Sequence, residues 1–364
     1  MELEHTHFAS PLFMPLSEIT RPDAMFRACC RHCEQKFAVE DAVAFTDFNC
    51  PHCHTPLIVP KIFSDYWLFD RRKVSERNRI YRALDPLLDR VVAIKVAKPD
   101  KTDADENRRR VRRLYYDAQI QSQLECDNVM EIYRCSCLAG REAKVMELLT
   151  GGGLHFNEDP ALRTDELLAL SAICSVAELL QCAAEFNIVH GQISPDNLRF
   201  NRIGVLKLLN FRPPEDFAPE VSWPEHEFIY LSPERLLNGE ATVKADIYSL
   251  AVILYQLLSN LHPMGFLEPG LGELDLVNRQ QRNPVPSLKN RAVFNDDELF
   301  SLISAMLSPH PEERPEYTEI IQILTNATRR LARKRNLQTA VKRLSEKLHA
   351  GIQYVQTGEF PVTD

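Results

Sequence analysis

The sequence predicts an α+β protein in which a small cysteine-rich module precedes a strand-rich segment and a longer helix-rich segment. Two Cys-x-x-Cys pairs fall within the first 60 residues, and alternating β-branched runs concentrate before residue 150. Longer apolar stretches at 167–180 and 247–258 follow, with the length of buried helices. With 45% hydrophobic and 26% charged residues, the 364-residue chain has the composition of a folded globular protein.

The cysteine pairs predict a metal site. Cys30 and Cys33 form one pair, and Cys50 and Cys53 form another after a spacer of 16 residues. Each pair can bring two thiolates to one ion, and two pairs complete the closed tetrahedral shell of structural zinc. About 35 residues with so few apolar side chains would not fold without such a staple. We therefore expect a structural zinc site.

The module resembles a bacterial-type zinc ribbon, although Glu34 and His54 stand where such ribbons often have glycine. This departure leaves the geometry of the two turns open. Cys29 could replace Cys30, one of the nearby histidines could replace a thiolate, and free surface cysteines are a further alternative. The histidines concerned are His32, His52 and His54.

Composition and the N-terminal sequence bear on partners and compartment. The net charge of −8 and pI near 5.8 give no attraction to polyanions, so nucleic acid is not expected as a partner. The N-terminus lacks the basic start and apolar run of a secretory signal, and the two apolar stretches are interrupted or too short to cross a bilayer. Ten cysteines without a signal indicate a reducing compartment, so we expect a cytoplasmic protein.

A series of motifs then runs from about residue 67 to residue 327. Val92–Val96 reads as a strand carrying Lys95, and a helical stretch follows around 115–124. The remaining motifs are Val145–Leu148, Gly151–Leu154, Ile188–His190, Pro195–Leu198, Val205–Phe211, Ser232–Glu234, Asp246–Leu250 and Arg314–Pro315.

In this order the motifs closely resemble a bacterial Ser/Thr protein kinase, and the resemblance implies a two-lobed kinase-like fold. It places Lys95 on the phosphates of ATP, aligns Asp117 as the helix partner of Lys95, and puts Glu147 and Leu149 at the hinge. It also implies nucleotide or metal contacts for Asn197 and Asn210. The structural positions that it carries over are Glu234 and Arg314, which pair with each other, and Asp246, which anchors the catalytic loop.

The residues that perform phosphoryl transfer are altered. Gln192 occupies the position of the catalytic base, and an amide cannot accept the proton of a substrate hydroxyl. Ser194 replaces the loop lysine, which removes a positive charge from the transferring phosphoryl group. Asn210 replaces the magnesium-binding aspartate and Arg212 the glycine two residues later, so magnesium is expected to bind weakly, if at all.

Two further segments depart from the kinase pattern. The phosphate-covering loop has Lys73, Ser75 and Asn78 at its three glycine positions, which obstructs close approach of the backbone to phosphate. The segment 212–234 is rich in proline and acidic residues and is expected to be a solvated loop. Its acidic residues are Glu215, Asp216, Glu220, Glu225 and Glu227.

We divide the chain into an N-terminal extension, a zinc ribbon, a linker, two kinase-like lobes and a C-terminal tail. A basic cluster at 329–335 begins the tail, and Leu337, Val341, Leu344 and Leu348 recur at helical spacing, which predicts an amphipathic helix. This helix could pack on the chain's own helical lobe or bind a partner. The boundaries are 1–24, 25–60, 61–70, 71–150, 151–328 and 329–364.

The leading functional hypothesis is a pseudokinase that acts in signalling as a protein-binding scaffold or allosteric regulator. One alternative is an enzyme, either a weak Ser/Thr kinase that recruits Asp196 or another acid, or an atypical nucleotide transferase. A second alternative is a sensor that binds ATP without magnesium. In each case zinc is the expected structural cofactor and a protein of unknown identity the expected partner.

Overall fold

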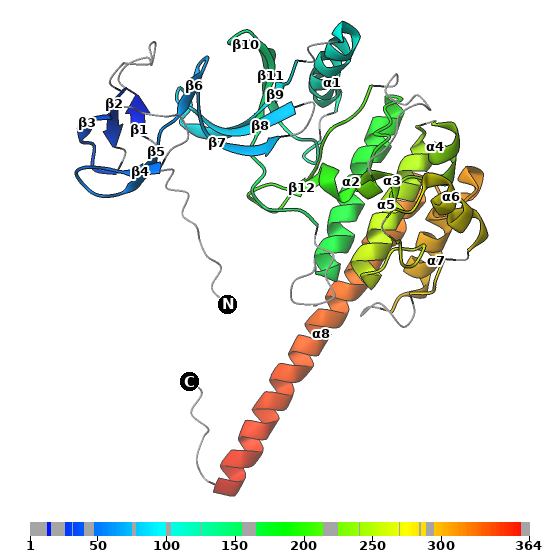
Figure 1. Ribbon diagram of the computed structural model, residues 1–364. Helices are drawn as coiled ribbons and strands as arrows, with labels where there is room; N and C mark the ends of the chain where they lie inside the picture. The colour runs from blue at the N-terminus through cyan, green and yellow to red at the C-terminus, as the bar shows by residue number, and fades with distance from the viewer. Residues whose placement is uncertain are drawn as a thin grey trace. The chain divides into compact units, whose positions relative to one another are not determined.

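The computed structural model divides the chain into two compact units, which we describe separately (Figure 1). Unit 1 comprises Met1–Gln123 and Met130–Thr150, and unit 2 comprises Leu124–Val129 and Gly151–Asp364. Beyond residue 339 only the backbone is described. The structure describes residues 13–15, 26–30, 32–39, 47–74, 78–99, 103–124, 126–154, 165–213, 225–239, 241–268, 270–283, 285–288 and 295–357.

The cysteine-rich module of unit 1 consists of short antiparallel strands. β1 (Phe13–Pro15), β2 (Phe26–Cys30) and β3 (Lys36–Val39) form a three-stranded sheet, and β4 (Asp47–Asn49) pairs with β5 (Pro56–Ile58). The sequence analysis assigned residues 1–24 to an extension, but β1 lies in that stretch. β1 gives β2 a second pairing partner beside β3. This third strand adds stability, because a two-stranded ribbon alone is only marginally stable in water.

A six-stranded antiparallel sheet forms the rest of unit 1 with one helix. Its strand order is β10-β11-β9-β8-β7-β6. The strands are β6 (Lys61–Phe63), β7 (Tyr66–Val74), β8 (Asn78–Asp85), β9 (Arg90–Ala97), β10 (Ile132–Leu138) and β11 (Arg141–Glu147).

Residues 61–70, which the sequence analysis interpreted as a linker, belong to this sheet. They form β6 and the first part of β7, which pair with each other across a tight turn. Phe63, Tyr66 and Leu68 are buried with side chains of β8, β9 and β11 in one core cluster. The apolar residues of this stretch are therefore strand residues whose side chains pack in the core of the sheet.

Helix α1 (Ala104–Gln123) is held by its cap and by one buried face. The Asp103 carboxylate accepts hydrogen bonds from the N–H groups of Asp105 and Glu106, at 2.8 and 3.0 Å, which satisfies donors of the first turn. Leu114, Asp117 and Ile120 are the buried residues of the helix and recur every three residues. A carboxylate therefore lies on the apolar face.

Unit 2 is mainly helical. A small hairpin of β12 (Leu198–Phe200) and β13 (Leu206–Leu208) follows α2, with the short turn Pro195–Asn197 immediately before it. Its helices are α2 (Glu166–Glu185), α3 (Glu225–Phe228), α4 (Pro233–Asn238), α5 (Val243–Ser259), α6 (Glu273–Arg282), α7 (Asp297–Met306) and α8 (Tyr317–Thr357).

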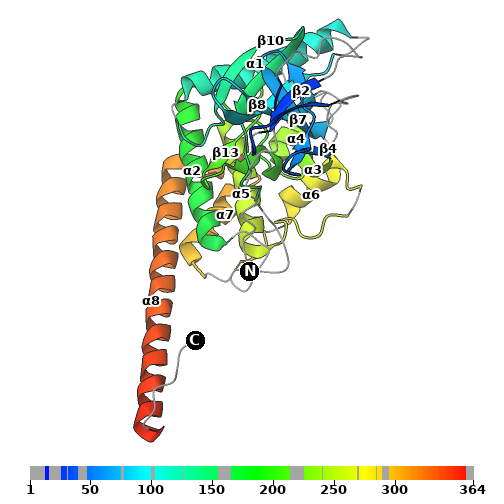
Figure 2. The same ribbon diagram turned by 90° about the vertical axis from the view of Figure 1, so that its left-hand side faces the viewer.

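α5 is the central helix of unit 2. Thr242 caps its first turn, Asn260 ends it in a left-handed conformation, and nearly every residue between them is buried. A helix that is apolar on all sides is stable only when other elements cover it. Here α2 and α7 each cover part of α5 (Figure 2). The only acidic residue in its first turn, Asp246, is therefore buried as well.

α8 is one continuous helix that includes both the end of the expected kinase-like lobe and most of the segment 329–364 that we expected to be a separate tail. Ile320, Leu324, Ala327 and Leu331 are buried, and this part of α8 lies beside α2 (Figures 1 and 2). Leu337, the first residue of the predicted stripe, is 67% exposed, so it does not pack on unit 2. The other three residues of the stripe lie outside the described side chains.

Some members of the basic cluster at 329–335 bind acidic residues of unit 2. Arg330 contacts Asp296 at 2.6 Å and Glu298 at 2.9 Å, and Arg335 contacts Asp165 at 2.8 Å. Asp165 and Asp296 are also the N-caps of α2 and α7. These ion pairs connect α8 to the beginnings of two other helices.

Within the described part of the chain, α2 alone is long and apolar enough to cross a bilayer on length and composition. It has 20 residues, more than the 167–180 stretch weighed from the sequence. In unit 2, 56% of its most apolar window is buried, as in the core helix of a folded lobe, so length alone is weak evidence for a membrane span.

The fold predicts a pH-dependent stability that arises from His262. Its Nε2–H donates to the Ile229 carbonyl at 3.0 Å, and its Nδ1 accepts from the Met264 N–H at 3.1 Å, so the neutral ring is fixed. Burial lowers the pKa of His262 to about 4. Because the folded-state pKa of His262 is depressed, the neutral ring contributes to the free energy of unfolding fully above pH ~6.5. This contribution, on the order of 3 kcal/mol, is lost as the pH falls toward 4. Unfolding midpoints across this range should fall more steeply for the wild type than for His262→Gln, and equal slopes would contradict the assignment.

Candidate functional site

Four cysteine side chains of unit 1 converge on one point. The sulfur atoms of Cys30, Cys33, Cys50 and Cys53 all lie within 4.8 Å of one another. Cys30 Sγ is 3.7 Å from Cys53 Sγ, and Cys33 Sγ is 3.8 Å from Cys50 Sγ. A tetrahedral ion with Zn–S bonds of about 2.3 Å requires sulfur separations of about 3.8 Å. The spacing therefore fits a four-thiolate zinc site.

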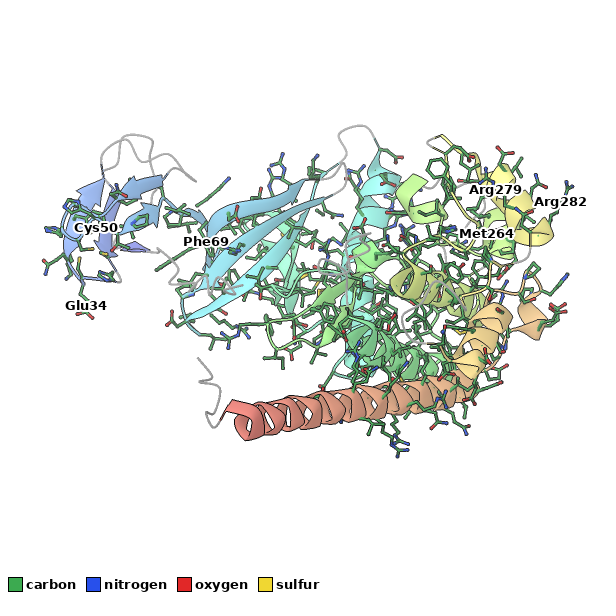
Figure 3. All side chains as sticks on the ribbon, turned by 90° about the horizontal axis from the view of Figure 1, so that it is seen from below. Glu34, Cys50, Phe69, Met264, Arg279 and Arg282 are labelled. Carbon is green, nitrogen blue, oxygen red and sulfur yellow. The ribbon has the colours of Figure 1, made fainter. Side chains whose placement is uncertain are left out.

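The two turns that carry the thiolates have the same backbone hydrogen bonds. The N–H of Glu34 donates to the Cys30 carbonyl at 2.8 Å, and the N–H of His54 donates to the Cys50 carbonyl at 2.9 Å. Glu34 and His54 both have a φ of 58°. The turns form although neither residue is glycine, and Figure 3 shows Glu34 pointing outward from the module.

The neighbouring histidines that were considered as alternative ligands are not part of this cluster. His32, His52 and His54 are exposed, and the metal-binding group contains the four cysteines alone among the described residues. The side chain of Cys29 lies outside the described residues. The Thr55 hydroxyl, 3.2 Å from Cys53 Sγ, and the Thr55 backbone lower the pKa of Cys53 to about 5, which favours the thiolate.

The cysteines also form the core of their module. Cys30, Cys50, Leu57 and Val59 make one buried cluster with a few partly buried side chains around it. Phe37 and Phe48 are in edge-to-face contact there, with ring centroids 6.0 Å apart. Two of the four cysteines are therefore buried core residues, which fits a structural role for an ion bound by all four sulfurs.

Lys95 and Asp117, which the resemblance aligns as partners, both lie in unit 1, but the ion pair that Asp117 makes is with another lysine. Lys95 is half-buried on β9, directly opposite Lys144 of β11. The Asp117 carboxylate accepts a hydrogen bond from Lys144 Nζ, and both side chains are buried. Asp117, whose side chain is one methylene shorter than glutamate, thus pairs with a lysine of β11, the strand next to β9.

The predicted hinge residues follow β11. Glu147 is half-buried, and its carboxylate accepts a hydrogen bond from the N–H of Glu131 at 2.9 Å, while its own N–H donates to the Glu131 carbonyl at 2.9 Å. Leu149 is half-buried as well. The Glu147 side chain therefore ties the end of β11 to the start of β10.

Of the expected phosphate-covering loop, Ser75 lies outside the described residues, and so does the side chain of Lys73. The backbone places Lys73 opposite Ile80 in the β7–β8 pair, and Asn78 begins β8 opposite Ala97 of β9.

In unit 2 a buried carboxylate holds the loop that contains Gln192. Asp246 accepts hydrogen bonds from the N–H groups of His190 at 2.8 Å and Gly191 at 2.9 Å. Gly191 has a φ of 72°, which an L-residue with a side chain rarely adopts. Burial raises the pKa of Asp246 to about 7, and the two N–H donors and Arg235 oppose that rise.

His190 links this loop to the Asn210 segment. Its Nδ1 accepts from the Gln192 N–H at 3.2 Å, and its Nε2 bonds the Leu209 carbonyl at 2.9 Å. Its ring lies edge-to-face on Phe211, with centroids 4.7 Å apart. The loop and the segment after β13 are thereby held together.

Gln192 is buried and bound to an acidic side chain. Its Nε2 donates to a carboxylate oxygen of Glu227, a residue of α3. The guanidinium of Arg212 lies 3.8 Å from the same oxygen. We expected the acidic residues of this segment to be solvated, but the Glu227 side chain is only 22% exposed. Residues 214–220 and the Glu225 side chain lie outside the described residues.

The two asparagines that the resemblance places near magnesium are bound to each other. Asn210 Nδ2 donates to Asn197 Oδ1 at 2.8 Å, and Asn197 Nδ2 donates to the Gln192 carbonyl at 2.8 Å. Asn210 has a φ of 65°, which asparagine tolerates better than most residues. Ser194 is 2% exposed, and its hydroxyl has no hydrogen-bond partner in the described part of the chain.

Arg314 binds Glu234, at the end of the segment that the resemblance to protein kinases assigns as the activation segment. The guanidinium makes two parallel hydrogen bonds to the Glu234 carboxylate, at 2.6 and 2.8 Å, and a third to the Lys244 carbonyl at 2.7 Å. It also lies over the Tyr248 ring, 4.9 Å from the centroid. A buried bidentate pair of this kind fixes α4 against the start of α5.

Two functional contacts escaped the sequence analysis. Lys144 was missed because β11 also carries Arg141, Glu142 and Glu147, so the sequence gives no sign that this one charged residue is buried. Glu227 was recognised only as part of an acidic run. Its contact with Gln192 joins residues 35 positions apart, which no local pattern reports.

Comparison with known proteins agrees with the fold. Residues 77–324 match the family model described as "Protein kinase domain". The chain is similar to the serine/threonine-protein kinase PrkC of Bacillus subtilis, 31% identical over 246 residues, which are 66% of this chain and 37% of that protein. It is 25% identical over 282 residues, 74% of this chain and 42% of the other, to the probable serine/threonine-protein kinase PknB of Lactococcus lactis. The chain thus spans less than half the length of these relatives.

The zinc geometry predicts a local response to metal removal. A strong chelator should release one zinc per chain and unfold the cysteine-rich module, because its small core includes two of the ligands. Unit 2 should stay folded. The readouts are zinc content and hydrogen exchange, with Cys137→Ser as a control cysteine outside the cluster. Zinc release with no loss of protection in the module would contradict this prediction.

The left-handed turns predict a gain in stability from glycine. Because Glu34 and His54 have a φ of 58°, Glu34→Gly and His54→Gly should each stabilise the zinc-bound module by about 1 kcal/mol. Resistance to chelator at equilibrium measures the effect. Glu34→Ala is the matched control, since it keeps the strain, and equal behaviour of alanine and glycine would contradict the explanation.

Proposed function

We propose that this chain, which belongs to the protein kinase family, is a pseudokinase that acts in the cytoplasm as a protein-binding scaffold or allosteric regulator in signalling. Phosphoryl transfer is absent or very weak. The observation that carries the proposal is the set of hydrogen bonds among Gln192, Asn197, Asn210 and Glu227. The polar groups that would act on a nucleotide are bound to one another.

The first argument concerns the base. In a protein kinase a carboxylate in the catalytic loop orients the substrate hydroxyl, and the resemblance assigns that position to Gln192. The amide does not ionise, and its N–H group is already donated to Glu227. Loss of general-base assistance typically lowers a rate by about 10² to 10⁴. Ser194, at the position of the loop lysine, supplies no positive charge.

The second argument concerns magnesium. This ion favours carboxylate and phosphate oxygens, whereas Asn197 and Asn210 offer neutral amide oxygens. The Asn197 oxygen accepts a hydrogen bond from Asn210, so a metal would have to displace that bond. These residues do not fit a magnesium site, and we expect weak binding at most.

The structural interactions of the kinase fold remain, which supports a binding role. Asp246 holds the loop, and Arg314 and Glu234 hold the activation segment by contacts that need no nucleotide and no phosphorylation. A fixed surface suits recognition of a protein partner. The zinc module supplies a second surface, and α8 beyond Leu331 supplies a third.

The contact of Glu227 with Gln192 favours one alternative, a weakly active Ser/Thr kinase. In that case Glu227 of α3, rather than a loop residue, would provide the carboxylate beside the acceptor hydroxyl. The Glu227 carboxylate already accepts a hydrogen bond from Gln192 and lies 3.8 Å from Arg212, so an acceptor hydroxyl would have to compete with these contacts. Asp196, the acid that the sequence suggested, is half-exposed and 3.8 Å from Arg199. A sensor that binds ATP through Lys95 and the hinge without magnesium is the second alternative.

Thermal unfolding with ATP, with and without magnesium, tests the proposal together with labelled-phosphate transfer by the purified chain. A scaffold should show no transfer and no magnesium-dependent shift, whereas ATP at 100 times its dissociation constant would stabilise the fold by about 2.7 kcal/mol. A shift without transfer would indicate the sensor.

Two variants separate the enzymatic alternative from contamination by another kinase. Transfer that is abolished by Lys95→Ala and by Glu227→Gln would establish an active enzyme and overturn the pseudokinase proposal. Glu227→Gln keeps the size and a hydrogen-bonding group, so it changes the charge beside Gln192 and little else. Transfer that both variants retain would come from elsewhere.

A further inference from the structure

A buried ion pair joins α1 to the sheet of unit 1. Lys144 Nζ donates to Asp117 Oδ2, and neither side chain is more than 5% exposed. The other carboxylate oxygen, Oδ1, is buried and has no hydrogen-bond partner among the described residues. A charge in such an environment is stable only while its counter-charge stays in place.

The register of the sheet places the two lysines of β9 and β11 side by side. Lys144 is directly opposite Lys95, and residues opposite each other in an antiparallel pair project from the same face. Two candidate partners for one helix carboxylate therefore occupy adjacent positions. The difference between them is burial, since Lys144 is fully buried and Lys95 is half-exposed.

Three further polar contacts join α1 to neighbouring segments of unit 1. Tyr115 Oη donates to Glu142 at 2.6 Å, Arg110 donates to the Lys98 carbonyl at 2.9 Å, and Gln121 accepts from the Ile132 N–H at 2.8 Å. Asp117 lies between them on the buried face with Leu114 and Ile120. It is the point at which the helix meets the sheet within the apolar core.

We infer that Lys144 of β11, and not Lys95 of β9, is the positioning residue that holds α1 against the sheet through Asp117. Moving this task to the neighbouring strand separates two functions that one lysine would otherwise combine, contact with a ligand and placement of the helix. The helix is then held by the chain's own charges, without a nucleotide. The inference concerns unit 1 alone and stands whether or not the protein transfers phosphate.

Hydrogen exchange of α1 and thermal unfolding of the full chain test the inference with two matched variants. Lys144→Met should lower the unfolding midpoint by roughly 10 °C and speed exchange in α1 by more than about tenfold, because it leaves the Asp117 charge buried and unpaired. Lys95→Met makes the same substitution at the opposite register position. It should leave the exchange of α1 within about twofold of the wild type.

Two further variants distinguish a charge interaction from packing. Asp117→Asn keeps the shape and removes the charge, so it should loosen α1 as strongly as Lys144→Met. Lys144→Met combined with Asp117→Leu removes both charges and should recover most of the lost midpoint and most of the protection. The double variant also decides the case in which Lys144→Met alone does not fold.

The outcomes that overturn the inference are specific. Equal loosening of α1 by Lys95→Met and Lys144→Met would return the role to Lys95, and loosening by Lys95→Met alone would exclude Lys144. Failure of the double variant to recover protection would show that Lys144 acts through packing and not through Asp117.

Discussion

The buried Asp246 carboxylate is the interaction on which the arrangement of unit 2 depends. It accepts the N–H groups of His190 and Gly191 from within the apolar helix α5. A charge in such a helix is tolerated because backbone donors satisfy both of its oxygens. The loop that Asp246 fixes then determines where Gln192 and Asn197 lie. The contacts of Gln192 with Glu227 and of Asn197 with Asn210 follow from that placement.

From this anchor the polar network extends outward through three amide side chains to one carboxylate. Asn197 bonds the Gln192 backbone, Asn210 bonds Asn197, and the Gln192 side chain reaches Glu227. Where a protein kinase has an aspartate as base and another aspartate as magnesium ligand, this chain has Gln192 and Asn210, and the Asn210 amide bonds Asn197 directly. The substitutions at Gln192 and Asn210 are therefore compatible, because each amide offers a donor as well as an acceptor.

In unit 1, too, buried polar side chains bind one another. Its helix is joined to the sheet by Lys144 and Asp117, and its cysteine-rich module has a four-sulfur site whose ligands are also its core. Ile58 of β5, like Trp67 and Val91, packs against the buried pair Phe69 and Leu84, so the module continues into the sheet. Residues 61–70, expected to be a linker, form β6 and the first part of β7 and provide that continuity. The cysteine cluster, its small core and the sheet thus follow one another along a single run of chain.

The sequence by itself determined the kinase-like order of motifs, the four cysteines and the loss of acidic groups at Gln192 and Asn210, because each is a local pattern with fixed spacing. Only the tertiary structure decided which lysine meets Asp117 and that Glu227 lies against Gln192, since strand register and chain reversal bring these residues together across 27 and 35 positions. It also decided that residues 61–70 are strands and that α8 runs without a break to Thr357. Short apolar segments carry too little periodicity to distinguish a linker from an edge strand. The sequence of a long helix also does not mark the residue at which its packing against the rest of the protein ends.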